Sequence, residues 1–483
     1  MFAKFSASAV RGRVTARRLT AAALMSGLVA TGPLLGAGAA VADDSARHQS
    51  GAVATLDGLK TFDRAVLRAN GTSHRIPAGL FEMTVDGGGR LKTYCVDIHN
   101  PTQDRAKYLE TAWNQTSLGA NRNAGRIRWI LQHSYPQVDD LAALAKSAGT
   151  GPLTQKTAAA GTQVAIWRYS DNAQVDAVDP AAEKLADWLE KRAGVVAEPT
   201  ASLRLDPSAV SGRPGARLGP VTVRTDADAV SLAPPTDAGV SGVRVTDAAG
   251  RPVTTAVNGG KLYFDVPAGT PDGSATLSAQ ATTSIPVGRA FSAAATTSQT
   301  QILAGSSQST VSASATATWA AKGAIPAVSA KKNCAKGGVD VTASNKGDAP
   351  FTFELAGTEH TIRAGESRTV TVPVDEDRAY DFTISGPGGF TESFQGVLDC
   401  RTTGAAVPGP EIEAQSHTTR PAPAAAGGSS AGTTSAGASV DLAATGGSSA
   451  TPVIAGFAVA LVVIGGTAVF FLREKKPATE KAE

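Results

Sequence analysis

Cysteine and aromatic residues are scarce in this chain. Three of its 483 residues are cysteines, too few for a disulfide-dense scaffold and too widely spaced for a zinc finger. Aromatic residues make up 5% of the chain and charged residues 18%. Glycine, with 51 residues, exceeds its usual share. We therefore expect several modest domains joined in part by linker, rather than one large core.

Acidic residues are absent from the first 42 positions. Lys4 and four arginines precede an apolar stretch from Leu19 to Val41, which ends in the small residues Ala40-Val41-Ala42. This order predicts a secretory signal peptide over residues 1–42. A transmembrane anchor is the alternative, but glycine and Pro33 interrupt the stretch. The Arg17-Arg18 pair also leaves twin-arginine export open, although general secretion is favoured.

Charge is absent again from Pro452 to Leu472, near the other end of the chain. A span of this length can cross about 30 Å of hydrocarbon, so it predicts a transmembrane helix over 452–472. Arg473, Lys475 and Lys476 follow directly, and by the positive-inside rule they place a short basic tail in the cytoplasm.

A pentapeptide stands just before this span: Leu442, Ala443, Ala444, Thr445 and Gly446. Pentapeptide, span and basic tail together resemble the sorting signal of Gram-positive wall proteins, in the Leu-Ala-x-Thr-Gly form found in actinobacteria. The resemblance implies that a sortase cuts after Thr445 and transfers its carboxyl group to a peptidoglycan precursor. The protein would be membrane-anchored before sorting and covalently attached to the cell wall afterwards. The alternative is a plain single-pass membrane protein.

The segment between the two ends carries slightly more acidic than basic residues, which gives no basic face for a nucleic acid. Residues 402–441 are rich in Pro, Gly, Ser and Ala without an apolar period, so we expect a disordered wall-spanning linker. Val, Thr and Ser with frequent turn signals predict an immunoglobulin-like β-sandwich over 199–330 and a smaller one over 331–401.

The most elaborately packed domain is expected over residues 50–198, where most of the Trp and Tyr residues lie. A strand ending at Val85, a turn at Asp86–Gly89 and a return strand from Leu91 to Ile98 predict a hairpin. Helical patterns follow at Ala158–Tyr169 and after Pro180. The fold class is thus an α+β domain followed by two all-β sandwiches, a linker and a transmembrane helix.

An odd number of cysteines in an exported protein needs an explanation. Cys334 and Cys400 bracket the smaller sandwich, so we pair them as a disulfide, which leaves Cys95 alone. Tyr94-Cys95-Val96-Asp97, together with Thr162-Gln163-Val164-Ala165 further on, resembles the thioester domain of Gram-positive surface adhesins. In that family, a Cys and the Gln of a Thr-Gln-x-Ala motif are joined. The resemblance implies an internal Cys95–Gln163 thioester.

Formation of such a thioester requires the sulfur and the amide carbon to be held close together, because an amide is a poor electrophile. Trp167, one helical turn after Gln163, could shield the bond from water, and Asp97 or His133 could move protons. The predicted protein is a surface adhesin or coat protein that acylates an amine, typically a lysine, on a target surface. It would act once, without turnover and without a cofactor or metal.

Two other readings stay open. The first is a non-covalent structural or carbohydrate-binding wall protein in which Cys95 is buried and inert. The second is a cysteine protease with His99 or His133 as its base, for which the sequence offers no supporting signature.

Overall fold

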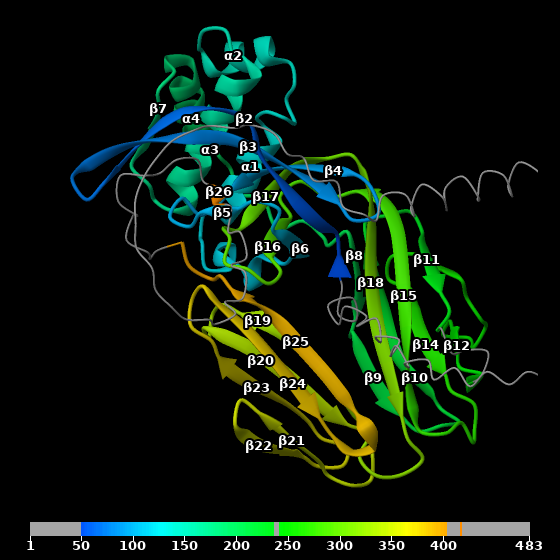
Figure 1. Cartoon of the computed structure of the whole chain (residues 1–483). Helices are drawn as coiled ribbons and strands as arrows, with labels where there is room; N and C mark the ends of the chain where they lie inside the picture. The colour runs from blue at the N-terminus through cyan, green and yellow to red at the C-terminus, as the bar shows by residue number, and fades with distance from the viewer. Residues whose placement is uncertain (1–49, 236–240, 403–415, 418–483) are drawn as a thin grey trace, which may run out of the picture. The chain divides into compact units, whose positions relative to one another are not determined.

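The computed structural model describes residues 50–235, 241–402 and 416–417, and most of its regular elements are β-strands (Figure 1). The signal peptide, the sorting pentapeptide and the 452–472 span lie outside these residues, as does most of the 402–441 linker. Among the described residues, no helix combines the length and apolarity needed to cross a membrane.

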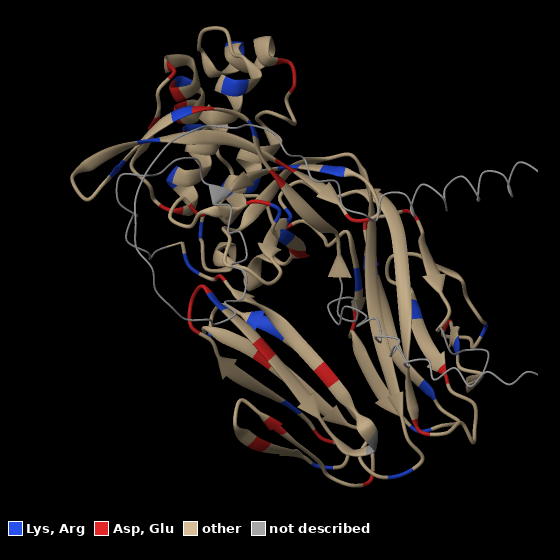
Figure 2. Ribbon diagram, viewed as in Figure 1, with Lys and Arg blue, Asp and Glu red and all other residues tan. Residues whose placement is uncertain are grey.

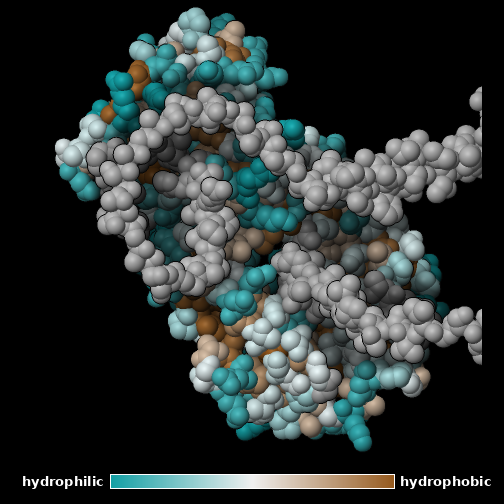
Figure 3. Space-filling model, in the orientation of Figure 1, coloured by the Kyte–Doolittle hydropathy of each residue, from teal (hydrophilic) through white to brown (hydrophobic). Residues whose placement is uncertain are grey.

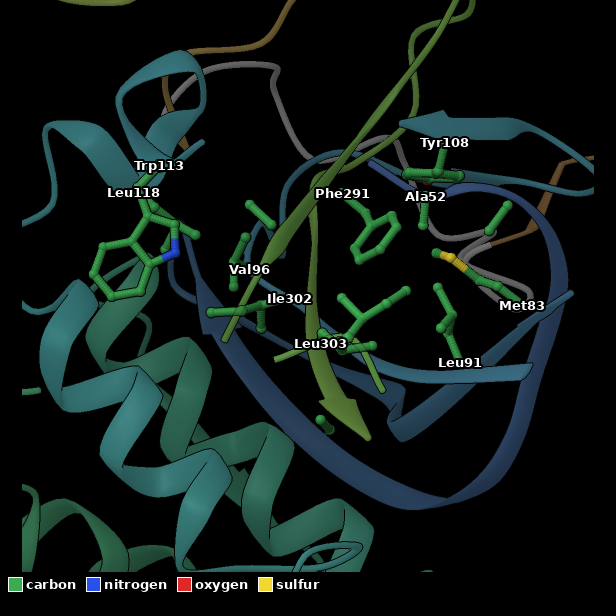
Figure 4. Packing of buried hydrophobic residues seen from close by; sticks show 14 of the residues in the cluster. Ala52, Met83, Leu91, Val96, Tyr108, Trp113, Leu118, Phe291, Ile302 and Leu303 are labelled. Atoms are coloured by element: carbon green, nitrogen blue, oxygen red, sulfur yellow. The ribbon is translucent and has the colours of Figure 1, made fainter. Parts of the chain in front are cut away.

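The N-terminal sheet closes on itself. Its strands run in the order β3-β4-β17-β16-β6-β2-β7, and β2 also pairs with β3, so that β7 is left outside the ring. The strands are β2 (Val53–Ala69), β3 (Thr72–Val85), β4 (Arg90–Cys95), β6 (Lys107–Thr111), β7 (Val175–Ala177), β16 (Ala290–Ala293) and β17 (Gln301–Ser306). Apolar side chains fill the ring, with Phe291 and Leu303 facing Met83 and Leu91 (Figure 4).

The hairpin expected around Asp86–Gly89 is confirmed, since β3 and β4 pair as antiparallel neighbours. Its turn depends on glycine, because Gly87, Gly88 and Gly89 have φ values of +85°, +109° and +112°, which other residues rarely adopt. The register ends at the Phe81–Thr93 pair, so β4 continues to Cys95 beyond its pairing with β3.

Four α-helices are described, and the long helical patterns in the sequence correspond to two of them. The helices are α1 (Ala124–Gln132), α2 (Leu141–Ala148), α3 (Gln155–Ser170) and α4 (Pro180–Arg192). Asp179 caps α4 by accepting bonds from the N–H groups of Ala181 and Ala182. Helix α3 is buried along most of its length and packs against α4, β2 and β3. The described residues also include three short 3-10 helices, η2 (Trp113–Gln115), η3 (Ser117–Gly119) and η4 (Pro387–Gly389).

A two-sheet sandwich is inserted into the N-terminal domain. One sheet has the order β1-β18-β15-β11-β13 with β9 beside β18, and the other has the order β12-β14-β10-β8. Their bounds are β1 (Ser50–Gly51), β8 (Leu203–Asp206), β9 (Ala209–Gly212), β10 (Arg217–Thr225), β11 (Val230–Ala233), β12 (Arg244–Thr246), β13 (Thr255–Ala256), β14 (Lys261–Asp265), β15 (Gly273–Ser284) and β18 (Gln308–Trp319).

The boundary expected at residue 198 therefore does not separate two domains. After β15 the chain returns to the N-terminal sheet, where β16 pairs with β6 and β17 pairs with β4, and it then re-enters the sandwich as β18. Without β16 and β17, the sheet would have open edges at β4 and β6. This pairing is non-local, so composition along the chain gave no sign of it.

The C-terminal β-unit has its own apolar core, which includes Val341, Phe351, Phe353 and Phe394. It consists of a three-stranded sheet and two strand pairs, which are β19 (Pro326–Asn333), β20 (Gly338–Asn345) and β23 (Ser367–Pro373), then β21 (Phe351–Leu355) with β22 (Thr358–Ile362), and β24 (Arg378–Ser385) with β25 (Thr391–Leu398). A separate short pair joins β5 (Thr102–Gln103) and β26 (Ser416–His417).

Charged residues of both signs are distributed over the described elements (Figure 2). Lys and Arg residues are scattered over the described elements and alternate with acidic ones (Figure 2). Hydrophilic side chains cover most of the visible surface at the helical end (Figure 3).

Candidate thioester site

Cys95 is the last residue of β4 and is fully buried and free of any disulfide. On one side, β4 pairs with β17, where Cys95 lies opposite Gln301. On the other side the pairing with β3 has already ended, so the main-chain groups of Cys95 need another partner.

Gln163 supplies that partner from α3. Its Oε1 accepts a hydrogen bond from the Cys95 N–H at 3.1 Å, and its Nε2 donates to the Cys95 carbonyl oxygen at 2.8 Å. Both polar atoms of the Gln163 amide thus bond to the main chain of Cys95, as the main chain of a neighbouring strand would. The Thr-Gln-x-Ala motif does reach Cys95, but it holds the end of the strand in place.

The amide that meets the sulfur belongs to Gln299. The Sγ atom of Cys95 directly contacts Oε1 of Gln299, a fully buried residue in the segment between β16 and β17. Gln299 is fixed in turn, because its Nε2 donates to Thr102 Oγ1 at 3.2 Å and its carbonyl oxygen accepts from the Tyr108 hydroxyl at 3.0 Å.

The sequence predicted that the Gln163 amide meets the Cys95 sulfur, but in the structure the Gln299 amide makes this contact. Gln299 lies 204 residues after Cys95 and belongs to the segment that returns from the inserted sandwich. The signal available in the sequence was weak: Gln299 and Gln301 stand just before the apolar residues Ile302 and Leu303. Only the closure of the sheet brings this segment to Cys95.

Trp167 completes the surroundings of the sulfur. Its indole is fully buried, and Nε1 donates towards Cys95 Sγ at 3.4 Å. It lies one turn after Gln163 on α3, as the spacing predicted. The indole therefore both covers the sulfur and offers it a hydrogen bond.

Burial strongly disfavours charge on this sulfur. It raises the pKa of the Cys95 thiol well above its ordinary value, and the nearby carboxylates of Asp171 and Asp97 raise it further, while the Trp167 hydrogen bond acts in the opposite direction. A free thiol at this position is therefore protonated, and a neutral, covalently bonded sulfur suits the pocket better than a thiolate.

Asp97 lies next to the sulfur, but its carboxylate points into a turn. It accepts bonds from the N–H groups of His99 and Asn100 and from Asn100 Nδ2, at 3.0, 3.3 and 2.7 Å. Its main-chain carbonyl oxygen is the atom that lies 3.0 Å from Cys95 Sγ. Burial raises the pKa of Asp97 to about 6. The carboxylate thus shapes the 97–100 turn.

His133 does not belong to the site. It follows α1 on the surface, where its ring stacks on Trp129 at 3.9 Å between centroids and its Nδ1 lies 2.8 Å from the Trp129 carbonyl oxygen. The expectation that His133 assists at Cys95 is wrong, because the end of α1 directs the ring to Trp129. A partly buried carboxylate that the sequence did not indicate does act on the sulfur: Asp171, which accepts from the Ile98 N–H at 3.3 Å.

The other cysteines are joined to each other. Cys334 and Cys400 form a disulfide with a Cα–Cα distance of 5.1 Å. It ties the end of β25 to the turn after β19. The sortase residues Leu442 to Gly446 lie outside the described part of the chain.

Two family models match parts of the chain. Residues 92–195 match the model described as "Thioester domain", and residues 326–397 match "Bacterial phospholipase C, C-terminal domain". The first match contains Cys95, Gln163 and Trp167 but ends before Gln299. No curated protein matched.

Solved structures were also compared. The Bacillus anthracis TIE protein aligns with 14% identity and a TM-score of 0.26, covering 73% of this chain and 81% of that one. The thioester domain of the Enterococcus faecium TIE86 protein aligns with 15% identity and a TM-score of 0.26, covering 56% and 96%. The family match thus shows that residues 92–195, which carry Cys95, are similar to a thioester domain.

Proposed function

We propose that this chain is an exported surface protein in which Cys95 and Gln299 form an internal thioester that acylates an amine on a target surface. The observation that carries the proposal is the contact between Cys95 Sγ and the side-chain amide of Gln299. Both side chains are fully buried, and Cys95 lies in the segment that matches the thioester family.

The formation step balances with the two side chains alone. The sulfur attacks Cδ of Gln299, the C–N bond breaks, and the thiol proton leaves with the amide nitrogen as ammonia. Hydrogen bonds to Thr102 and Tyr108 hold Gln299 in place, which supplies the positioning that an unreactive amide requires.

The acylation step uses the same carbon. A primary amine attacks Cδ of Gln299, the C–S bond breaks, and the sulfur takes up a proton released by the amine. The Trp167 N–H favours this departure because it stabilises negative charge on the leaving sulfur. Each molecule reacts once, so we propose no turnover activity. The resulting amide bond would not dissociate under shear.

We further propose that a sortase attaches Thr445 to a peptidoglycan precursor and that residues 402–441 carry the reactive domain through the wall. This part rests on the sequence pattern alone. Replacing Thr445 with Ala should release the protein from the wall fraction obtained by muralytic digestion. A Thr445→Ala variant that stays in that fraction would contradict covalent anchoring.

The proposal is tested by mass spectrometry of the secreted protein. With the Cys334–Cys400 disulfide counted, the intact mass should be one ammonia below that of the sequence. Methylamine should then add to one glutamine and free the Cys95 thiol in equal amount. Peptide fragmentation should place the methylamide on Gln299.

The two glutamines can be told apart in this experiment. A methylamide on Gln163 would restore the pairing expected from the sequence and reject Gln299. An unmodified wild-type mass with an alkylatable Cys95 would reject the thioester altogether. It would favour the non-covalent structural or carbohydrate-binding alternative, in which Cys95 is an inert buried residue.

A further inference from the structure

Three carboxylates gather at one end of the C-terminal β-unit. Glu376 and Asp377 lie between β23 and β24, and Asp399 directly follows β25. One oxygen from each lies within 4.8 Å of the other two. Two oxygens that bind the same Ca²⁺ ion at 2.3–2.6 Å are at most about 5 Å apart, so this spacing suits a shared ion.

Asp399 provides a second, independent observation. Its side chain is buried, with 5% of the residue exposed. Oδ2 accepts a hydrogen bond from Thr300 Oγ1 at 2.6 Å, but Oδ1 is buried with no hydrogen-bond partner among the described residues. A buried carboxylate oxygen without a partner is costly, and a cation would remove that cost.

The surrounding charge is also unbalanced. The carboxylates of Asp97 and Asp377 act on Asp399, while Lys332 is the cation that acts on both Asp399 and Glu376. The Lys332 ammonium donates to Ser292 Oγ at 2.9 Å, and burial lowers its pKa to about 8. One lysine does not offset the negative charge of this group of carboxylates.

The remaining oxygens of the cluster have neighbours that would position them. Glu376 Oε1 accepts bonds from the N–H groups of Cys400 and Arg401, and Asp377 Oδ1 accepts from Asn100 Nδ2 at 3.3 Å. These bonds leave other oxygen positions on both carboxylates available to an ion. The donors are all oxygens, which excludes a typical zinc site.

We propose that Glu376, Asp377 and Asp399 bind a Ca²⁺ ion where the C-terminal β-unit meets the loop that carries Gln299. Ca²⁺ fits better than Mg²⁺ because its flexible coordination accepts carboxylates from two separate segments, whereas Mg²⁺ demands a near-ideal octahedron. The ion would fix Thr300, which follows Gln299 directly, through Asp399. This inference does not depend on the thioester, since its ligands and its test involve neither Cys95 nor Gln299.

The test is Ca²⁺ binding by the full chain after dialysis against EDTA. Calorimetric titration should show one ion per chain with a dissociation constant at or below about 1 mM, the range of extracellular modules. Saturating Ca²⁺ should raise the melting temperature. Absence of both effects in the wild-type chain at about 10 mM Ca²⁺ would overturn the proposal, and an equal response to the same concentration of Mg²⁺ would overturn the Ca²⁺ assignment.

Two variants make the result specific. Asp399→Asn keeps an acceptor for the Thr300 hydroxyl and removes an uncompensated charge. In EDTA this variant should therefore melt no lower than the wild type. Its melting temperature should not rise when Ca²⁺ is added. Asp377→Asn, at a partly exposed position, should also lose the response. Glu359→Gln on exposed β22 is the matched control and should respond like the wild type. A full response in both aspartate variants would reject the site.

Discussion

Two glutamines contact Cys95, one at its main chain and the other at its sulfur. Gln163 hydrogen-bonds the N–H and carbonyl groups of Cys95, where β4 extends beyond the end of its pairing with β3, and the Gln299 amide contacts the sulfur. Either residue alone would be an ordinary buried polar side chain. Together they fix the strand end and place an amide carbon near the thiol, which is the positioning that the proposed chemistry needs.

The indole N–H of Trp167 can be tested apart from its bulk. Trp167→Phe keeps an aromatic cover but loses the donor to Cys95 Sγ. A hydrogen bond to a charged group contributes about 1.5–3 kcal/mol, so the reaction of methylamine should slow about tenfold or more. The measurement is the rate of thiol release after methylamine is added.

Trp113→Phe is the matched control for that experiment. Its indole N–H is also buried and donates to the Gly288 carbonyl oxygen, away from the sulfur. It should react with methylamine at the wild-type rate once circular dichroism shows an intact fold. Equal rates in both variants would remove Trp167 from the reaction.

Buried carboxyl groups near the site should make stability depend on pH. Burial raises the pKa of Asp97 from 3.8 to about 6 and that of Asp399 from 3.8 to about 7. Between the ordinary pKa of 3.8 and the raised values, the folded chain holds protons that the unfolded chain has lost. The free energy of unfolding should therefore fall as pH rises from about 4 to 7. Urea midpoints measured in EDTA should show this fall.

Asp399→Asn should flatten the upper part of that pH profile, because it removes the group with the higher of the two values. In EDTA, a wild-type midpoint that rises steadily from about pH 4 to pH 7 would contradict the assigned direction of both shifts.

At the scale of elements, the close approach of α3 to α4 depends on Gly161. A Cβ atom at this position would lie 2.4 Å from the Ala182 carbonyl oxygen, which is main chain and cannot move aside cheaply. Gly161→Ala should therefore destabilise the domain by about 1–3 kcal/mol, although alanine favours helix more than glycine does. Urea unfolding followed by tryptophan fluorescence measures the change.

The control for Gly161 is Gly151→Ala, because a Cβ there meets no atom within 4 Å. It should leave the urea midpoint nearly unchanged. If Gly161→Ala were as stable as this control, the helices would have room to separate and the tight contact would not be required.

The elements that sequence analysis predicted correctly are those specified by neighbouring residues. The glycine turn at Asp86–Gly89 and the Asp179-Pro180 helix start are local signals, and both are present. The positions of β16 and β17 were missed, because their partners β6 and β4 lie far away in the sequence. The error at Gln299 has the same cause, since the local motif pointed to the other glutamine that touches Cys95.

At the scale of the whole molecule, a buried network of ion pairs links the segments that join the inserted sandwich to the N-terminal sheet. Arg289, which precedes β16, donates to Glu110 of β6 at 2.8 Å and to Glu198 at 2.9 Å. Glu110 also accepts from the N–H groups of Ala52 and Ser202. The network thus joins the points where the chain leaves the N-terminal sheet and where it returns.

Breaking this network from one side should be costly. Arg289→Met leaves the buried Glu110 without its cation, and we expect a loss of about 3–5 kcal/mol in the free energy of unfolding, measured with urea. Adding Glu110→Gln should recover part of that loss. Arg244→Met, which removes an exposed ion pair with Asp265, should change stability by less than about 1 kcal/mol. Equal losses in both single variants would show that burial of the network is unimportant.

The return of the chain through β16 and β17 also sets an order in time. Cys95 is synthesised well before Gln299, and the whole inserted sandwich up to β15 lies between them. A nascent chain therefore carries only a thiol at this position, and the proposed electrophile cannot arise until the second segment has emerged and taken its place in the sheet. Amines met during synthesis would find no electrophile to react with, and a truncated product that ends within the sandwich would not acylate anything.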